Sequence, residues 1–138
     1  MYLYLVKLDI SDEIKNILKI GVAVNVKGRI AHMRKDTGRP VELIHAWKLD
    51  GFYGYVRKNY AVEQQAHHYL KGSEFPMADY FPNFGGKTEC FDININKAYS
   101  TIGNAIRYAE SNPVPLKKGY VITSKGYIKN KGYIQSWE

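Results

Sequence analysis

Two apolar segments near the start of the chain restrict the fold more than any other feature of the sequence. In the first, residues 2–8, apolar side chains occupy both parities. Those at even positions are Tyr2, Tyr4, Val6 and Leu8. Apolar residues at both parities are typical of a strand that is covered on both faces. After a polar turn, residues 17–24 (Ile-Leu-Lys-Ile-Gly-Val-Ala-Val) predict a second such strand, so the two form a hairpin with a longer loop.

The remainder of residues 1–112 alternates between predicted helices and strands. Asn25 is a suitable N-cap for a short helix to about Lys35, because Val26, Ile30 and Met33 recur at helical spacing. Further elements follow: a strand over 41–49, a helix over 53–70 ended by Gly72, a strand over 91–95, and a helix capped by Asn96 that stops before Pro113. The aromatic loop 72–90 is either packed on the domain or offered to a ligand.

The last segment, residues 113–138, repeats the tripeptide Lys-Gly-Tyr. Its repeated residues are Lys118, Tyr120, Lys125, Tyr127, Lys131 and Tyr133. Val or Ile follows each repeat, so we expect a meander of three very short strands that extends the same domain. Interleaved lysine and tyrosine could neutralise phosphates and stack on bases, which makes these residues candidates for nucleic-acid binding. The alternative is a packed sheet extension with solvated lysines at its edge, and the two interpretations are compatible.

The charge of the chain favours a polyanionic partner. Its 138 residues include 20 Lys and Arg against 13 Asp and Glu, which gives a net charge of +7. Each phosphate that a protein neutralises releases counterions, so this surplus favours nucleic acid. The single cysteine, Cys90, excludes an internal disulfide and a cysteine-based zinc site. Because the apolar run at the N-terminus is too short for a membrane span or a signal segment, we expect a cytoplasmic protein.

A few polar side chains are candidates for a catalytic site. Glu63 and His67 lie four residues apart on a predicted helix, so they project from one face beside its apolar stripe. A carboxylate there is costly unless it is paired or bound to a metal, and such a residue is more often a structural ion-pair partner. On the hairpin, Tyr4 and Lys19 can face the same way from neighbouring strands. Arg29 lies on the short first helix.

Together and in this order, these residues resemble the GIY-YIG nuclease family. The most similar branch is the phage and "meiotically up-regulated" one, in which the second motif is often Lys-Ile-Gly. The matching segments are Tyr4-Leu-Val6, Lys19-Ile-Gly21, Arg29, Glu63-Gln-Gln-Ala-His67 and Glu89-Cys-Phe91. The resemblance covers about residues 2–95. It implies an α+β fold in which a small three-stranded antiparallel sheet is flanked by helices, with the site on one sheet face.

The resemblance also implies a reaction, the hydrolysis of DNA phosphodiesters with one divalent metal ion, magnesium or manganese. Glu63 would be the metal ligand, and Arg29 would stabilise the charge on the phosphate in the transition state. Tyr4 would orient or deprotonate the attacking water. Lys19 would occupy the place of the family's second tyrosine, where its charge favours the phenolate form of Tyr4.

The sequence departs from the family pattern at the histidine found one turn beyond the arginine. Met33 stands at that position. His67 could supply the missing function from the other helix, or His45 could supply it from the strand over 41–49. His45 shares parity with Trp47, which favours a structural role for it.

Three hypotheses on function follow. The favoured one is an endonuclease that acts on DNA, foremost double-stranded DNA, in a bacterial or phage-infected cell. The second is a DNA-binding module on the same scaffold without cleavage, and the third is a phage protein that binds a host protein through loop 72–90. Arg29 and Glu63 together favour the enzyme, because an acid near phosphates repels DNA unless a metal inverts the local charge.

Overall fold

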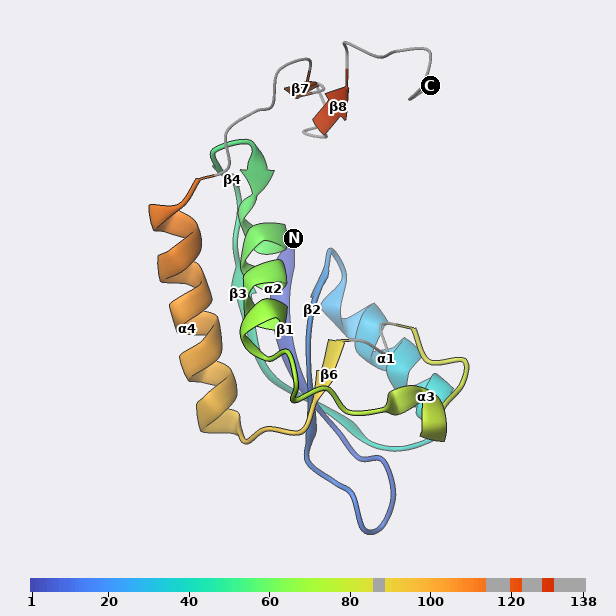
Figure 1. Ribbon diagram of the computed structural model, residues 1–138. Coiled ribbons are helices and arrows are strands. Elements are labelled where there is room, and N and C mark those ends of the chain that lie inside the picture. The colour runs from blue at the N-terminus through green and yellow to red at the C-terminus, as the bar shows by residue number, and fades with distance from the viewer. Residues whose placement is uncertain (86–88, 114–119, 123–127, 131–138) are drawn as a thin grey trace.

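A four-stranded antiparallel sheet forms the centre of the molecule (Figure 1). The computed structural model describes residues 1–85, 89–113, 120–122 and 128–130. Across the sheet, the strands are β3 (Val41–Lys48), β1 (Tyr2–Leu8), β2 (Ile17–Ala23) and β6 (Cys90–Phe91). The predicted hairpin of β1 and β2 and the three-stranded antiparallel sheet are confirmed, and the short β6 adds a fourth strand at the outer edge of β2.

Helices cover both faces of this sheet, as the apolar residues at both parities of β1 require. The helices are α1 (Val26–Thr37), α2 (Lys58–Tyr69), α3 (Met77–Tyr80) and α4 (Ile95–Ser111). On one face, α2 and α4 lie side by side over a core that includes Leu3 and Ile102 (Figure 1). On the other face, α1 and α3 close a second core that includes Val6, Met33 and Met77. No helix in the described part of the chain is long and apolar enough to cross a membrane.

Asparagine side chains set where two of these helices begin. Asn25 caps α1 as predicted, since its side chain accepts a hydrogen bond from the backbone N–H of Gly28 at 3.0 Å. The cap predicted at Asn96 is wrong. Asn94 is the residue that still has extended backbone, and its side chain accepts from the N–H of Lys97 at 2.7 Å, so α4 begins two residues earlier than expected.

Two other predicted elements are shorter than expected. The helix expected from Tyr53 begins at Lys58, because a small hairpin of β4 (Phe52–Tyr53) and β5 (Val56–Arg57) precedes it. Gly54 lies in the turn of that hairpin with a φ of 66°, which glycine adopts without strain. The strand expected over 91–95 ends at Phe91, because Phe91 already pairs near the start of β2 and little of that strand is left beyond it.

The aromatic segment between α2 and β6 packs mainly onto the domain. Among its described residues, Met77 and Phe84 are buried, and Phe75 and Phe81 are partly buried against the same core. Tyr80 is 44% exposed and stacks on Phe75 with ring centroids 5.3 Å apart. Of the two options that the sequence leaves open for this loop, packing is therefore the main one.

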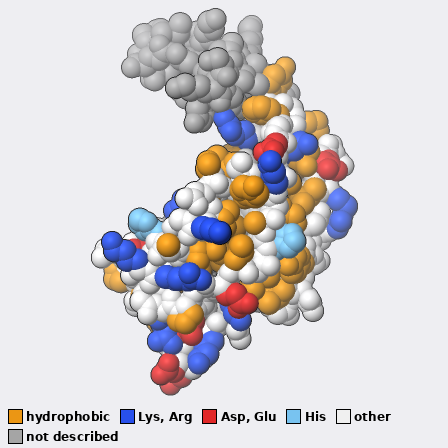
Figure 2. Space-filling view, turned by 180° about the vertical axis from the view of Figure 1, so that it is seen from behind, with side chains coloured by type: hydrophobic (Ala, Val, Ile, Leu, Met, Phe, Trp, Pro, Cys, Tyr) orange, Lys and Arg blue, Asp and Glu red, His pale blue; other side chains and the backbone are white. Residues whose placement is uncertain are grey.

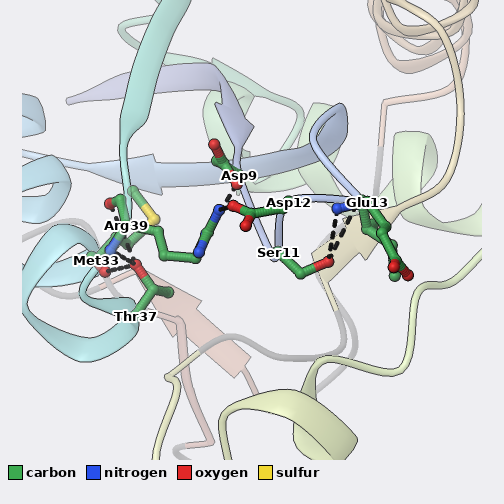
Figure 3. A network of polar contacts seen from close by, with 8 residues as sticks. Asp9, Ser11, Asp12, Glu13, Met33, Thr37 and Arg39 are labelled. Carbon is green, nitrogen blue, oxygen red and sulfur yellow. Dashed lines mark hydrogen bonds and ion pairs between the residues drawn. The ribbon is translucent and has the colours of Figure 1, made fainter.

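A polar network ties the end of α1 to the loop between β1 and β2 (Figure 3). Arg39 follows α1 and donates from Nε to Asp9 at 2.8 Å and from Nη2 to Asp12 at 3.1 Å. The hydroxyl of Thr37 donates to the carbonyl of Met33 at 2.9 Å in the last turn of the helix. These contacts hold the C-terminal end of α1 against the hairpin, so they help to fix the helix that carries the candidate arginine.

The C-terminal segment contributes two short antiparallel strands, β7 (Tyr120–Ile122) and β8 (Ile128–Asn130). This pairing agrees with part of the predicted meander, whose third strand would lie outside the described residues. Of the candidates for nucleic-acid binding in this segment, Tyr120 lies in β7. The others lie outside the described residues: Lys118, Lys125, Tyr127, Lys131 and Tyr133.

Candidate active site

Tyr4 and Lys19 meet on the sheet face that α1 covers. In the antiparallel register of β1 and β2, Tyr4 pairs with Gly21 and Val6 pairs with Lys19, so Tyr4 and Lys19 are diagonal neighbours on one face. The ammonium Nζ of Lys19 donates to the hydroxyl oxygen of Tyr4 at 2.9 Å. The prediction that these two side chains face the same way is therefore confirmed.

Gly21 provides the space in which the Tyr4 ring ends. A Cβ atom at position 21 would lie 2.6 Å from Cζ of Tyr4 and 3.0 Å from Nζ of Lys19, and it would also collide with the tyrosine hydroxyl oxygen. Any side chain at this position would force the Tyr4 ring or its strand to move. The glycine of the Lys-Ile-Gly motif thus has a packing reason that is specific to the Tyr4–Lys19 contact.

Lys19 is a buried cation held by a carboxylate. Its residue is 2% exposed, and its Nζ lies 2.5 Å from Oε2 of Glu89, immediately before β6. Burial lowers the pKa of Lys19, but Tyr4 and Glu89 raise it by more, so the pKa ends above its ordinary value and the side chain remains charged. The family resemblance includes Glu89 in a motif but gives it no role. Its contact with Lys19 joins residues 70 positions apart, and no local pattern indicates such a contact.

Glu63 lies on α2 with its carboxyl group close to this charge pair. The residue is 5% exposed. Burial first, and then repulsion by Glu89, raise the pKa of Glu63 to about 7, while Lys19, Gln64 and a hydrogen bond from the backbone of Val22 act in the opposite direction. A buried carboxyl group that changes charge near neutral pH is typical of catalytic and metal sites.

His67 occupies the edge of β2 just beyond the end of β6. Its Nε2 lies 2.8 Å from the carbonyl oxygen of Ile20, and a carbonyl can only accept, so Nε2 carries the proton. Burial lowers the pKa of His67, which keeps the ring neutral. β6 pairs only with Leu18 and Lys19 of β2. Beyond them along the same edge, His67 forms a hydrogen bond with the carbonyl of Ile20, and Glu63 forms one with the backbone N–H of Val22.

The alternative histidine, His45, lies in an aromatic cluster away from these groups. Its ring centroid is 4.4 Å from that of Trp47 on the same strand and 5.9 Å from that of Tyr99 on α4. These packing contacts agree with the structural role that its shared parity with Trp47 favours.

Arg29 is exposed on α1 beside an open cavity of about 350 Å³. The cavity is lined by Ala23, Val24, Asn25, Gly28, Arg29 and His32. It begins at the end of β2, the strand that carries Lys19, and it lies at the N-terminus of α1, where backbone N–H groups favour anions. The surroundings of Arg29 therefore suit a phosphate. On the face seen in Figure 2, lysine and arginine side chains lie among hydrophobic ones.

The comparison with protein families matches residues 1–106 to the T5orf172 domain. The chain belongs to the T5orf172 domain family. No curated protein and no solved structure matches this chain. The T5orf172 domain is a phage-associated, nuclease-type domain, so membership points to a nuclease or DNA-binding role. The matched span runs from β1 into α4 and contains the whole cluster of Tyr4, Lys19, Glu63 and Glu89.

The donor atoms of this T5orf172 domain fit one kind of metal site. Within residues 1–85 and 89–113 and the two short C-terminal strands, no group of three or more His, Cys, Asp or Glu side chains could hold a metal ion. Glu63 offers a carboxylate group, whereas the carboxylate of Glu89 is already paired with the ammonium group of Lys19. Magnesium is commonly bound by one or two carboxylates, with water and substrate phosphates as its other ligands. The residues present therefore fit a substrate-assisted magnesium or manganese site.

Proposed function

We propose that this T5orf172 domain is a metal-dependent DNA endonuclease of the GIY-YIG type, in the Lys-Ile-Gly branch, which hydrolyses phosphodiester bonds of double-stranded DNA. The observation that carries the proposal is that a tyrosine and a buried lysine from two strands are in contact, and that a buried glutamate of α2 interacts electrostatically with that lysine. Tyr4 and Lys19 are in contact at 2.9 Å, and the charge of Lys19 lowers the pKa of Glu63 against the effect of burial. A simple DNA-binding surface has no need of a buried carboxyl group beside its cations.

Glu63 would be the ligand of one magnesium or manganese ion. Carboxylates bind metal ions in their deprotonated form, so a bound ion would remove the proton that Glu63, with a pKa of about 7, partly holds at neutral pH. When bound, the ion would polarise the phosphate and help the leaving oxygen to depart.

Tyr4 would orient or deprotonate the attacking water. Lys19 already donates to the hydroxyl oxygen of Tyr4, so the phenol's own proton points elsewhere. The exposed Arg29 would approach the phosphate and balance the charge that develops on it. Tyr4 is 1% exposed in the free protein, so DNA binding would open the path for water to its hydroxyl.

The test is cleavage of supercoiled plasmid DNA with magnesium, with manganese and with EDTA. Wild-type protein should nick the plasmid with either metal and not with EDTA, and Glu63→Gln should abolish nicking because the amide is a poor metal ligand. Glu13→Gln is the matched control, since Glu13 is an exposed acid in the loop between β1 and β2. Equal nicking by wild type and Glu63→Gln would exclude Glu63 as the metal ligand.

The second candidate function is DNA binding without cleavage. Two observations favour it: the buried position of Tyr4, and the absence of a group of three metal-binding side chains among the described residues. It predicts that wild-type protein shifts DNA in a gel, with an affinity that falls steeply with salt, and cuts it with neither metal. Cleavage that requires metal and Glu63 would exclude it.

A further inference from the structure

Glu89 is the only acid in ion-pair contact with Lys19 among the described residues. Lys19 is almost fully buried, while the Glu89 side chain is 27% exposed at the edge of the sheet. The ammonium group therefore lies between two oxygens, the Tyr4 hydroxyl at 2.9 Å and the Glu89 carboxylate at 2.5 Å. Contacts therefore run from Glu89, beside the edge strand β6, through Lys19 on β2 to Tyr4 on β1.

The lysine needs such an anchor because its own geometry does not fix it. A lysine side chain has a flexible four-carbon stem and an ammonium group that donates in any of several directions. Gly21 has no side chain, and the Tyr4 ring and the ammonium group themselves fill the space beside it, so position 21 offers no polar atom that would hold the ammonium group. The Glu89 carboxylate supplies the missing constraint from the other side.

We propose that Glu89 is a positioning residue of this site, whose carboxylate holds the ammonium group of Lys19 against the hydroxyl oxygen of Tyr4. This inference rests on the proposed nuclease function. Glu89 acts through Lys19 and contacts neither the metal nor the scissile phosphate. The partly exposed carboxylate of Glu89 also repels DNA. Glu89 therefore increases the rate of the reaction step and slightly weakens the affinity for DNA.

A second lysine–glutamate ion pair on the same sheet lies outside the site and serves for comparison. Lys7 and Glu42 lie 3.0 Å apart on β1 and β3, with side chains that are 34% and 62% exposed. Exposed pairs of this kind contribute little, because water screens both charges. Breaking the buried pair instead leaves a charged lysine without its anchor. Glu42 is therefore the matched control for Glu89.

The experiment measures kcat for plasmid nicking and, separately, the Kd for DNA with calcium in place of magnesium. The variants are Glu89→Ala, Glu89→Gln, Glu42→Ala, Lys19→Met and the double variant Lys19→Met/Glu89→Ala, each checked for folding by its melting curve. Glu89→Ala should lower kcat by roughly 10- to 100-fold, which is the scale of misplacing a reacting group by about 1 Å. Its Kd should stay equal or become tighter, because one negative charge is lost.

The other variants separate positioning from a structural effect. Glu89→Gln keeps an acceptor oxygen of the same reach, so it should recover part of kcat, and Glu42→Ala should match wild type. The double variant should be no slower than Lys19→Met, because Glu89 acts only through Lys19. Wild-type kcat in folded Glu89→Ala, or independent losses that multiply in the double variant, would overturn the inference. If wild type itself does not cut DNA, the proposed function fails and this inference fails with it, which is a different result from the two above.

Discussion

At Glu63, a carboxyl group is held where water barely reaches it. With a pKa of about 7 in the folded protein against an ordinary value of 4.5, the folded state binds a proton that the unfolded chain has already released at neutral pH. A raised pKa of this kind stabilises the fold below the ordinary value, and the stabilisation is lost as the pH rises through 7. The same residue that suits a metal ion therefore weakens the metal-free protein at neutral and higher pH.

Glu63→Gln should make the metal-free protein more stable at pH 8 and leave its stability nearly unchanged at pH 4, below the ordinary pKa of the carboxyl group. Glutamine has no proton to lose and still offers an oxygen to the backbone of Val22. The pKa difference corresponds to a gain on the order of 3 kcal/mol in the free energy of unfolding at pH 8. Urea unfolding at both pH values in EDTA measures it.

Glu13→Gln is the control for this measurement, because Glu13 is exposed and its replacement should change stability at neither pH. Adding magnesium should then raise the stability of wild type and leave that of Glu63→Gln unchanged, since an ion that binds only the folded state stabilises it. Equal unfolding curves for wild type and Glu63→Gln at pH 8 would show that the Glu63 carboxyl is better solvated than its 5% exposure indicates.

The sequence alone predicts some contacts between side chains of the site but not others. The meeting of Tyr4 and Lys19 follows from the parity of two strands joined by one loop, which is local information. The pairing of Lys19 with Glu89 does not, because it depends on where β6 joins the edge of β2 after about half the chain has intervened. Contacts across an element boundary of this kind are set by tertiary packing.

At the scale of elements, α2 completes the sheet that β6 leaves unfinished. β6 pairs with only two residues of β2, and beyond them the edge would present free backbone groups inside the protein. His67 and Glu63, one turn apart on α2, occupy two of those groups. The Glu-x-x-x-His spacing thus has a structural explanation in addition to the catalytic one that the family resemblance implies.

His67→Gln separates these two explanations. Glutamine is neutral and can place an N–H near the position of Nε2, so it should keep the bond to Ile20, the stability to within about 1 kcal/mol and the nicking activity. His67→Ala leaves the Ile20 carbonyl without its partner and should lose about 1–3 kcal/mol of stability. Urea unfolding and plasmid nicking measure both variants. A stable His67→Gln variant without activity would instead support the role in catalysis.

The sequence predicts the helices and strands that have a hydrophobic periodicity of their own. It does not predict the short strands that form only because a neighbouring strand pairs with them. The long strands and α1 lie within two residues of their predicted bounds, because apolar parity and an asparagine cap are local. β4 and β5 are two residues each, and their hairpin depends on the turn at Gly54. So short a strand has no periodicity of its own, and the sequence around it predicts the start of a helix instead.

At the scale of the whole molecule, the net positive charge and the repeated C-terminal segment both suggest DNA binding, and neither is part of the site described above. The chain carries a net charge of +7, and three of its lysines belong to the Lys-Gly-Tyr repeats. The family match ends at residue 106, so this segment lies outside the part of the chain that the T5orf172 domain accounts for. Its contribution to DNA binding can therefore be tested without touching the cluster around Lys19.

Replacing Lys118, Lys125 and Lys131 together by glutamine should weaken DNA binding and make it less dependent on salt. Each lysine that neutralises a phosphate releases about one counterion, so the slope of log K against log salt should fall in magnitude by up to about 3. Plasmid nicking by the variant at saturating DNA should remain close to wild type, because the proposed site lies elsewhere in the chain. The matched variant carries arginine at the three positions, which keeps the charge and should keep both affinity and slope. If affinity and slope are unchanged in the glutamine variant, the repeats bind no phosphate and serve only as a sheet extension of the domain, and the DNA-binding surface must then be sought around Arg29.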